Sequence, residues 1–236
     1  MFKGIQAFNG KGSIQAGSEG KIALLQTQSV LQKGLRFFLI VCLVSLYPLY
    51  RILPIWVAWE NNILENAQAI VLFGGFLISL YFAYLAARSK RNKFWLAVSP
   101  FWFILWGREI NWGRVFLKPI GMEKIHGPKF PPLHSLWYGP IVKPLLVFCI
   151  LLGFYLLFKY HGYHLLRQLF HQKGFPIFEL TIAVLVIVLS PLAEHNYSHL
   201  FGMRNELMEE ILELISYIGL FISQLDIFFQ TQQENV

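Results

Sequence analysis

Arg108, Glu109 and Arg114 are ionisable residues in one of the most apolar parts of the sequence. They belong to the stretch WGREINWGR, residues 106–114, which follows a nearly unbroken run of apolar and aromatic residues. At about 1.5 Å per residue, Arg108 lies roughly 21 Å along a helix that begins at Phe94, within the depth of the membrane hydrocarbon. A charge costs about 2.5–3.5 kcal/mol at the bilayer centre and less toward the interface. These side chains should therefore face protein or water.

A local excess of acid is predicted at the same membrane face. Glutamates stand at the entry to the second apolar segment, and four more open the last one. Most of the 13 Asp and Glu residues fall on this side, whereas most Lys and Arg fall on the other. Arginines can neutralise part of the excess, and a bound cation or a cationic substrate group can neutralise the rest. The acids are Glu60, Glu65, Glu206, Glu209, Glu210 and Glu213, and the arginines are Arg51, Arg108, Arg114 and Arg204.

Glu194, His195 and His199 form a candidate metal site at the end of the fifth apolar segment. The two histidines are four residues apart and share a helix face if the helix continues past Pro191. Imidazole and carboxylate groups bind Zn or Fe, and metal-activated water can cleave a phosphate or amide bond. The alternative, favoured by the lack of an HExxH motif, is a network of hydrogen bonds and ion pairs that orients the helices. A divalent metal ion is thus one candidate cofactor, and no other is indicated.

The composition identifies the environment of these residues. With 56% hydrophobic and 17% aromatic residues and a mean hydropathy of +0.50, the chain lies outside the range of soluble domains. The net charge of +7 comes from short basic clusters between apolar runs, where Lys and Arg meet anionic head groups. Cys42 and Cys149 lie within apolar runs and fit no disulfide or metal spacing. Membrane lipids are therefore the expected partners, nucleic acid is not, and the oligomeric state stays open.

The pattern predicts an all-α fold, a polytopic transmembrane helical bundle of about six spans. A span needs about 20 residues, and six apolar segments approach or exceed that length. Residues 1–33 are rich in Gly, Gln, Ser and Lys and are predicted to be a flexible cytoplasmic tail. Residues 34–230 form the transmembrane domain, and residues 231–236 form a short cytoplasmic tail. The predicted spans are 35–54, 64–87, 94–116, 141–158, 176–194 and 207–229.

Basic residues and tryptophans predict the orientation. RSKRNK at 88–93 places four positive charges between the second and third spans, which is typical of a cytoplasmic turn. An even number of spans then puts both termini in the cytoplasm. The proline-rich loop 117–140 is predicted to lie outside, where it could cover the polar site. The tryptophans expected at the outer interface are Trp56, Trp59, Trp106, Trp112 and Trp137.

REINWGR at 108–114 resembles the EEISWGQR signature of an uncharacterised family of bacterial polytopic membrane proteins. PLHSL at 132–136 is similar to that family's NLHNL, and ELMEEILELISYIGLF is similar to its last span. The resemblance covers about residues 55–229 and implies a location in the bacterial cytoplasmic membrane. The functional positions that it implies are Glu109, Trp112, Gly113 and His134.

This sequence departs from the family pattern at three places. Arg108 stands where the family has its first Glu, Arg114 where it has Gln, and Ser135 where it has Asn. The loss of one carboxylate argues against a metal site built on paired carboxylates. The resemblance therefore implies a site but no particular chemistry.

Two classes of function fit these residues. The first is a membrane-embedded enzyme that acts on a lipid head group or lipid-linked substrate from the outer side. The second is a non-catalytic carrier or a membrane assembly or structural factor. A carrier is expected to have broken helices in both halves, whereas only the third span here carries such signals. The candidate residues are Glu109, His134 and Glu210 for catalysis, Arg108, Asn111, Trp112 and Arg114 for substrate binding, and Glu194, His195 and His199 for metal.

In the enzyme hypothesis, Glu109 or Glu210 is the general base, and a histidine is the acid or a metal ligand. Arg108 and Glu109 are adjacent, so on a helix their side chains point about 100° apart and need separate partners. Glu109 should face the polar site, and Arg108 should pair with an acid of another span. The acids predicted as partners of Arg108 are Glu60, Glu65 and Glu213, and the groups predicted to meet around one cavity are Glu109, Glu194 or His195, Glu210 and His134.

Overall fold

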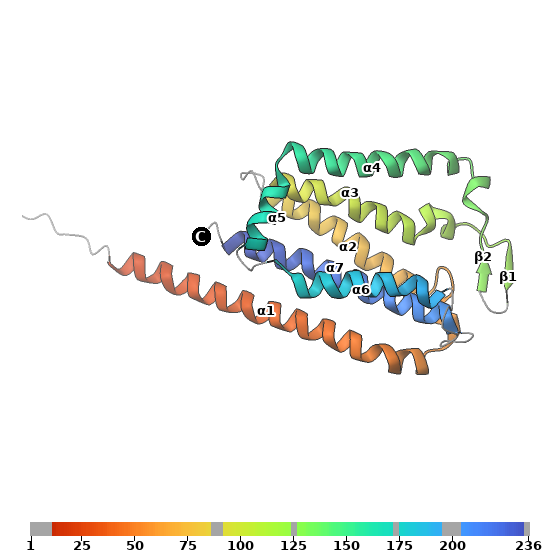
Figure 1. The fold of residues 1–236 in the computed structure, drawn as a ribbon, viewed down its shortest axis with the longest axis horizontal. Helices are drawn as coiled ribbons and strands as arrows, with labels where there is room; N and C mark the ends of the chain where they lie inside the picture. Colours follow the sequence, from red (N-terminus) through yellow and green to blue (C-terminus); the bar gives the residue numbers. More distant parts are fainter. Residues whose placement is uncertain (1–10, 86–91, 124–126, 172–174, 195–203, 234–236) are drawn as a thin grey trace, which may run out of the picture.

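The computed structural model describes residues 11–85, 92–123, 127–171, 175–194 and 204–233 of the chain, and these are helical almost throughout (Figure 1). The predicted all-α helical bundle is thereby confirmed. The elements are α1 (Lys11–Ile52), η1 (Ile55–Ala58), α2 (Ile63–Leu85), α3 (Asn92–Glu109), η2 (Asn111–Phe116), β1 (Gly121–Glu123), β2 (Gly127–Lys129), η3 (Leu133–Ser135), α4 (Gly139–Lys159), α5 (Gly162–His171), α6 (Ile177–Glu194) and α7 (Asn205–Gln233).

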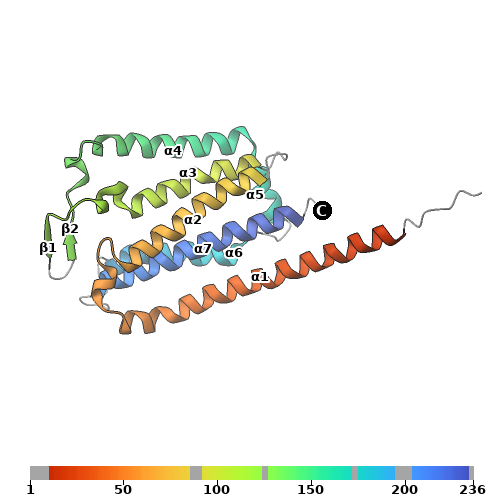
Figure 2. The same ribbon diagram turned by 180° about the vertical axis from the view of Figure 1, so that it is seen from behind.

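The long helices run roughly side by side, with α2 at the centre (Figures 1 and 2). Helix α2 packs against α3 on one side and α7 on the other. Helix α4 packs on the far side of α3, and α7 also packs against α6 and α1. The antiparallel pair β1–β2 lies at the end of the bundle where α3 and α6 finish and α2, α4 and α7 begin. We call this the hairpin end, and the other, where α5 lies, the α5 end.

In the part of the chain that the structure describes, four helices are long and apolar enough to cross a membrane, as in a multi-pass membrane protein. These four helices are α1, η1–α2, α4 and α7. Two other apolar helices are not among them: α6, which is shorter, and α3, which has 18 residues. The outer surface is apolar too: on α4, Phe148, Leu151 and Phe158 are each about 60% exposed. An apolar surface of that extent needs hydrocarbon around it.

Two boundaries differ from the predicted ones. Helix α1 begins at Lys11, within the segment expected to be a flexible tail. Helix α3 ends at Glu109 instead of continuing to residue 116. The second difference has a local cause, because Asn111, Trp112 and Gly113 all adopt positive φ angles, which no α-helix can contain.

The centre of the bundle depends on a close approach between α2 and α3. Trp102 of α3 is buried and packs with Leu72 and Tyr217 in one apolar cluster. Its indole ring lies against Gly75 of α2, where a Cβ atom would come within 2.5 Å of the ring. Gly74, by contrast, has no neighbour closer than 3.8 Å to such an atom. Gly75 therefore provides the space in which Trp102 packs.

We expect Gly75→Ala to lower the free energy of unfolding by about 1–3 kcal/mol, because the added methyl group overpacks against a rigid indole. Gly74→Ala is the matched control: its methyl group meets ordinary van der Waals space, and alanine is the better helix former. Denaturant unfolding in detergent measures both. Equal effects of the two substitutions would contradict the close packing of α2 and α3.

Candidate functional site

The turn after α3 directs polar side chains back toward the bundle. Asn111 (φ 46°), Trp112 (φ 54°) and Gly113 (φ 85°) follow one another in the left-handed region. Asn and Gly tolerate this conformation, whereas an aromatic residue in it costs on the order of 1–3 kcal/mol. Packing holds Trp112 in place, since its ring lies over Gly107, where a Cβ atom would come within 2.7 Å, and meets Phe103 edge to face.

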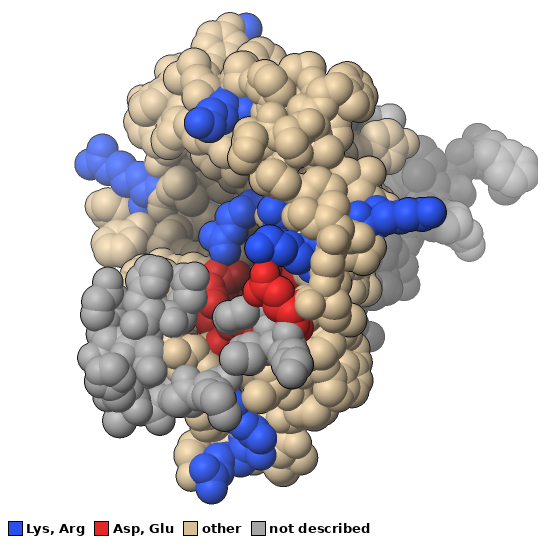
Figure 3. All heavy atoms as spheres, turned by 90° about the vertical axis from the view of Figure 1, so that its right-hand side faces the viewer, with Lys and Arg blue, Asp and Glu red and all other residues tan. Residues whose placement is uncertain are grey.

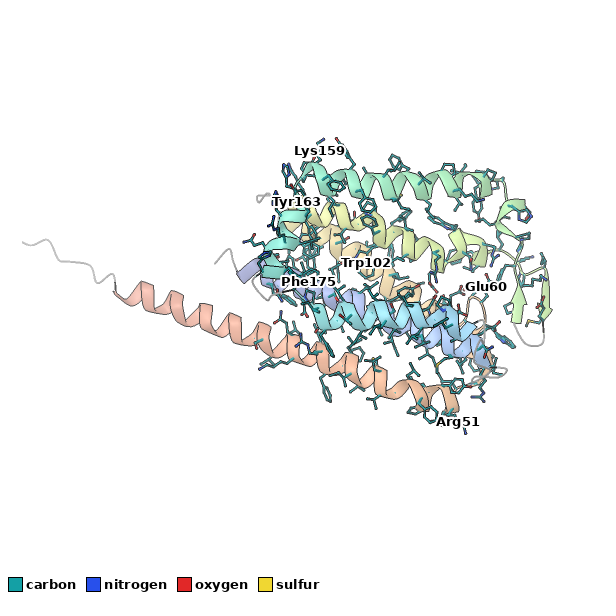
Figure 4. All side chains as sticks on the ribbon, in the orientation of Figure 1. Arg51, Glu60, Trp102, Lys159, Tyr163 and Phe175 are labelled. Atoms are coloured by element: carbon teal, nitrogen blue, oxygen red, sulfur yellow. The ribbon has the colours of Figure 1, made fainter. Side chains whose placement is uncertain are left out.

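This turn is joined to the start of α2 by hydrogen bonds and an ion pair. The Asn111 side chain donates to Glu60 Oε1 at 2.9 Å, and Arg114 forms an ion pair with the same carboxylate. In return, Asn61 Nδ2 donates to the Val115 carbonyl at 3.1 Å. Asn111 and Arg114, predicted to bind substrate, thus hold η2 against the α2 entry. Figure 4 shows Glu60 at the hairpin end.

Arg108 links α3 to α7. Its Nη2 lies 2.6 Å from Glu213 Oε1, which confirms the expected pairing with an acid of another span. Ser190 of α6 donates to the same oxygen at 3.4 Å. The Glu213 side chain is 10% exposed, whereas the Arg108 side chain is 56% exposed. The guanidinium is therefore accessible while it neutralises a buried carboxylate.

Glu109 is buried beside the same ion pair, and only 6% of its surface is exposed. The Tyr217 hydroxyl lies 3.2 Å from Glu109 Oε2 and 3.3 Å from Glu213 Oε2. One hydroxyl proton can serve only one of these carboxylates at a time. Glu109 therefore faces the interior, as predicted, and shares the Tyr217 hydroxyl with Glu213.

Glu210 joins the group from α7 and is held by Gln68 of α2. Gln68 Nε2 donates to both Glu210 Oε2 and the Glu210 carbonyl, each at 2.8 Å. Gln68 is fully buried, and its Oε1 has no partner within the described residues. Sequence reasoning missed Gln68, although an amide within an otherwise apolar span is the signal that could have revealed it.

The acidic cluster consists of Glu60, Glu65, Glu109, Glu210 and Glu213. Its carboxylates come from α2, α3, α7 and the turn before α2, and several lie close enough to repel one another. Two arginines form ion pairs with it among the described residues, so carboxyl groups outnumber their cationic partners there. Figure 3 shows acidic side chains gathered at the centre of the hairpin end, with basic side chains beside them. A proton or a bound cation must offset this excess in a low-dielectric site.

Other predicted members are placed elsewhere. His134 is exposed on η3 and makes no hydrogen bond or ion pair with the cluster within the described part of the chain. His195 and His199 lie outside the described residues, and α6 ends at Glu194. Arg204, expected to neutralise acids, instead donates to the Tyr50, Arg51 and Leu53 carbonyls at the end of α1.

The predicted metal site is not supported. In the described ranges, no group of three or more His, Cys, Asp or Glu side chains is arranged to hold a metal ion. The carboxylates of the acidic cluster are instead turned toward arginine, amide and hydroxyl donors. The chemistry that this arrangement offers is recognition of a positively charged group and proton transfer by a buried carboxylate.

No family model, curated protein or solved structure matches the chain. The resemblance to the EEISWGQR family therefore stays a prediction. The positions that it implies have distinct places here: Glu109 lies in the acidic cluster, Trp112 and Gly113 form the left-handed turn, and His134 is exposed.

Substitutions at Arg108 and Glu109 should separate structural from functional roles. Arg108→Gln leaves the buried Glu213 without its cation, and we expect a loss of about 1–3 kcal/mol, moderated by solvent at the exposed guanidinium. Glu109→Gln removes a carboxylate from an acidic excess and keeps its shape, so folding should be retained. Monodisperse yield and thermal unfolding in detergent measure both. If Glu109→Gln misfolds as badly as Arg108→Gln, the role of the cluster is to hold the helices together.

Proposed function

We propose that the protein is an enzyme embedded in the membrane that acts on the head group of a lipid or lipid-linked substrate at the acidic cluster. The observation that carries the proposal is the excess of carboxylates, two of them buried, over ion-paired arginines at one end of the bundle in the described residues. Such an excess attracts a cationic substrate group, because charge complementarity lowers the cost of burying it. On the orientation expected from the basic turn 88–93, this end faces the outer side.

Glu109 is the general base in this proposal. It is buried, it accepts one hydrogen bond from Tyr217, and Arg108 is engaged by a different acid. A carboxylate in those surroundings is free to take a proton from a nucleophile that attacks the substrate. Glu210 lies beside it, is held by Gln68, and supplies a negative charge when a bound cation offsets the repulsion from the neighbouring acids. Glu60 is occupied by Arg114 and Asn111 and has no part in the chemistry.

Lipid analysis of reconstituted protein tests the proposal. After incubation in vesicles of mixed phospholipids, mass spectrometry should detect a lipid whose head group has been removed or altered. Glu109→Gln should lower the initial rate by about 10²-fold or more, since it removes the base. Glu123→Gln is the matched control, because Glu123 is an exposed carboxylate at the same end that pairs with Lys129. Unaltered lipids with the wild-type protein, or equal rates for the two variants, would contradict the proposed enzymatic activity.

A carrier of protons or cations is a second candidate function, favoured by buried acids toward the α5 end. Glu179 of α6 is fully buried and pairs with Arg36 of α1, with Nε and Oε1 2.6 Å apart. Asp226 of α7 is 3% exposed, and its Oδ1 has no partner among the described residues. Buried polar groups on α7 between the two ends are Ser216, Ser223 and Gln224.

Flux measurements test the carrier. In vesicles that enclose a pH-sensitive dye, an imposed pH difference should collapse faster with the wild-type protein than with Asp226→Asn. Glu123→Gln again serves as the control, because its carboxylate lies on the surface of β1. Collapse no faster than in vesicles without protein would exclude proton transport by this route.

A further inference from the structure

An apolar groove separates α3 from α6 and α7. It encloses about 230 Å³ and is lined by side chains of these three helices. Trp102 and Leu105 come from α3, Leu180 from α6, and Leu220 and Ile227 from α7. Figure 4 shows Trp102 between α3 and the α6–α7 pair. Helix α3 packs mainly against α2 and α4, and toward α7 it makes ring contacts through Trp95 and Trp102, so the groove is the space left between these contacts.

The groove leads to the acidic cluster. Its lining positions on α3 recur every three or four residues from Phe94 to Leu105, and one further turn of the same face reaches Arg108 and Glu109. On α7, one turn before Leu220 is Tyr217, the hydroxyl donor to the cluster. From Phe94 to Leu105 the groove is roughly 16 Å long, about half of the hydrocarbon thickness. Its length thus equals about the depth of one lipid leaflet.

Arg108 stands where the apolar groove meets the acids. Its ion pair with Glu213 uses Nη2, while more than half of its side chain is exposed. A guanidinium has five N–H donors in a planar fork that matches a phosphate group. Along α3, the order is therefore an apolar groove, then a cation with donors to spare, then the carboxylates of Glu109 and its neighbours.

We propose that the groove binds one acyl chain of a phospholipid with an amino head group. The phosphodiester lies at Arg108, and the ammonium group faces the acidic cluster. The three parts of such a lipid match the order of the site: hydrocarbon against apolar side chains, anion against cation, and cation against carboxylates. A helix of a partner protein does not fit, because one of about 10 Å diameter and 16 Å length occupies on the order of 1,000 Å³. This assignment rests on the proposed function and names its substrate class.

Photo-crosslinking in vesicles tests where the acyl chain lies. The protein is reconstituted in phosphatidylglycerol vesicles, whose head group has no cation, with a trace of phosphatidylethanolamine that carries a photoreactive acyl chain, and labelled residues are mapped by mass spectrometry. Labels should concentrate at Trp102, Leu105 and Leu220. Val98→Trp, which fills the groove, should reduce these labels several-fold, whereas Leu151→Trp on the exposed face of α4 should not. If labels on the wild-type protein spread evenly over exposed α4 and α6 positions, the groove is not the acyl-chain site. This result does not depend on whether Val98→Trp folds.

The head-group assignment needs a second comparison. A diacylglycerol probe with the same photoreactive chain lacks phosphate and ammonium and should label the groove several-fold less than phosphatidylethanolamine. Arg108→Lys should keep part of this preference, and Arg108→Gln should abolish it. Equal labelling by both probes in the wild-type protein would overturn the role of Arg108. Labelling needs no turnover, so the two proposals can fail separately. Groove labelling without lipid alteration would contradict the proposed enzymatic activity alone. Lipid alteration without groove labelling would contradict the proposed lipid substrate alone.

Discussion

The arrangement of the hairpin end depends on the cost of placing ionised side chains within a lipid bilayer. Every such group must find its partner inside the protein, because hydrocarbon offers none. The Arg108–Glu213 pair meets this requirement between α3 and α7, two helices that both pack on α2. The pair thereby fixes the end of α3 relative to α7 and leaves the groove between them. Glu109, next in sequence to Arg108, is turned inward as a consequence.

The strained turn after α3 also brings cationic and polar partners to an acid at the hairpin end. Left-handed backbone at Trp112 costs free energy, and the ring recovers part of that cost by packing over Gly107. The turn brings Asn111 and Arg114 onto Glu60, so this acid is neutralised. Among the described residues, the donors to Glu109 and Glu210 are neutral: Tyr217 and Gln68. The acids of one cluster therefore divide into two that pair with arginine and join the elements, Glu60 and Glu213, and others that have no arginine partner among the described residues.

Much of this could be predicted from sequence, because membrane insertion constrains composition strongly. Apolar runs gave the helices, and the cost of a lone charge predicted an acidic partner for Arg108. The end of α3 could not be predicted, since it depends on how Trp112 packs in three dimensions. Gln68 and Asp226 were missed because hydropathy reports which segments are apolar and does not report which face of each helix meets α7. His134 was expected in the cluster from its position in a loop, and loop paths are not set by periodicity.

A double-mutant cycle on Arg108 and Glu213 tests the central constraint most directly. Unfolding free energies are measured in detergent for the wild-type protein, Arg108→Gln, Glu213→Gln and the double variant. If a buried carboxylate must have its cation, the double variant should be more stable than Arg108→Gln, with a coupling energy of about 1–3 kcal/mol. Additive effects within about 0.5 kcal/mol would contradict the account, because the two charges would then not depend on each other.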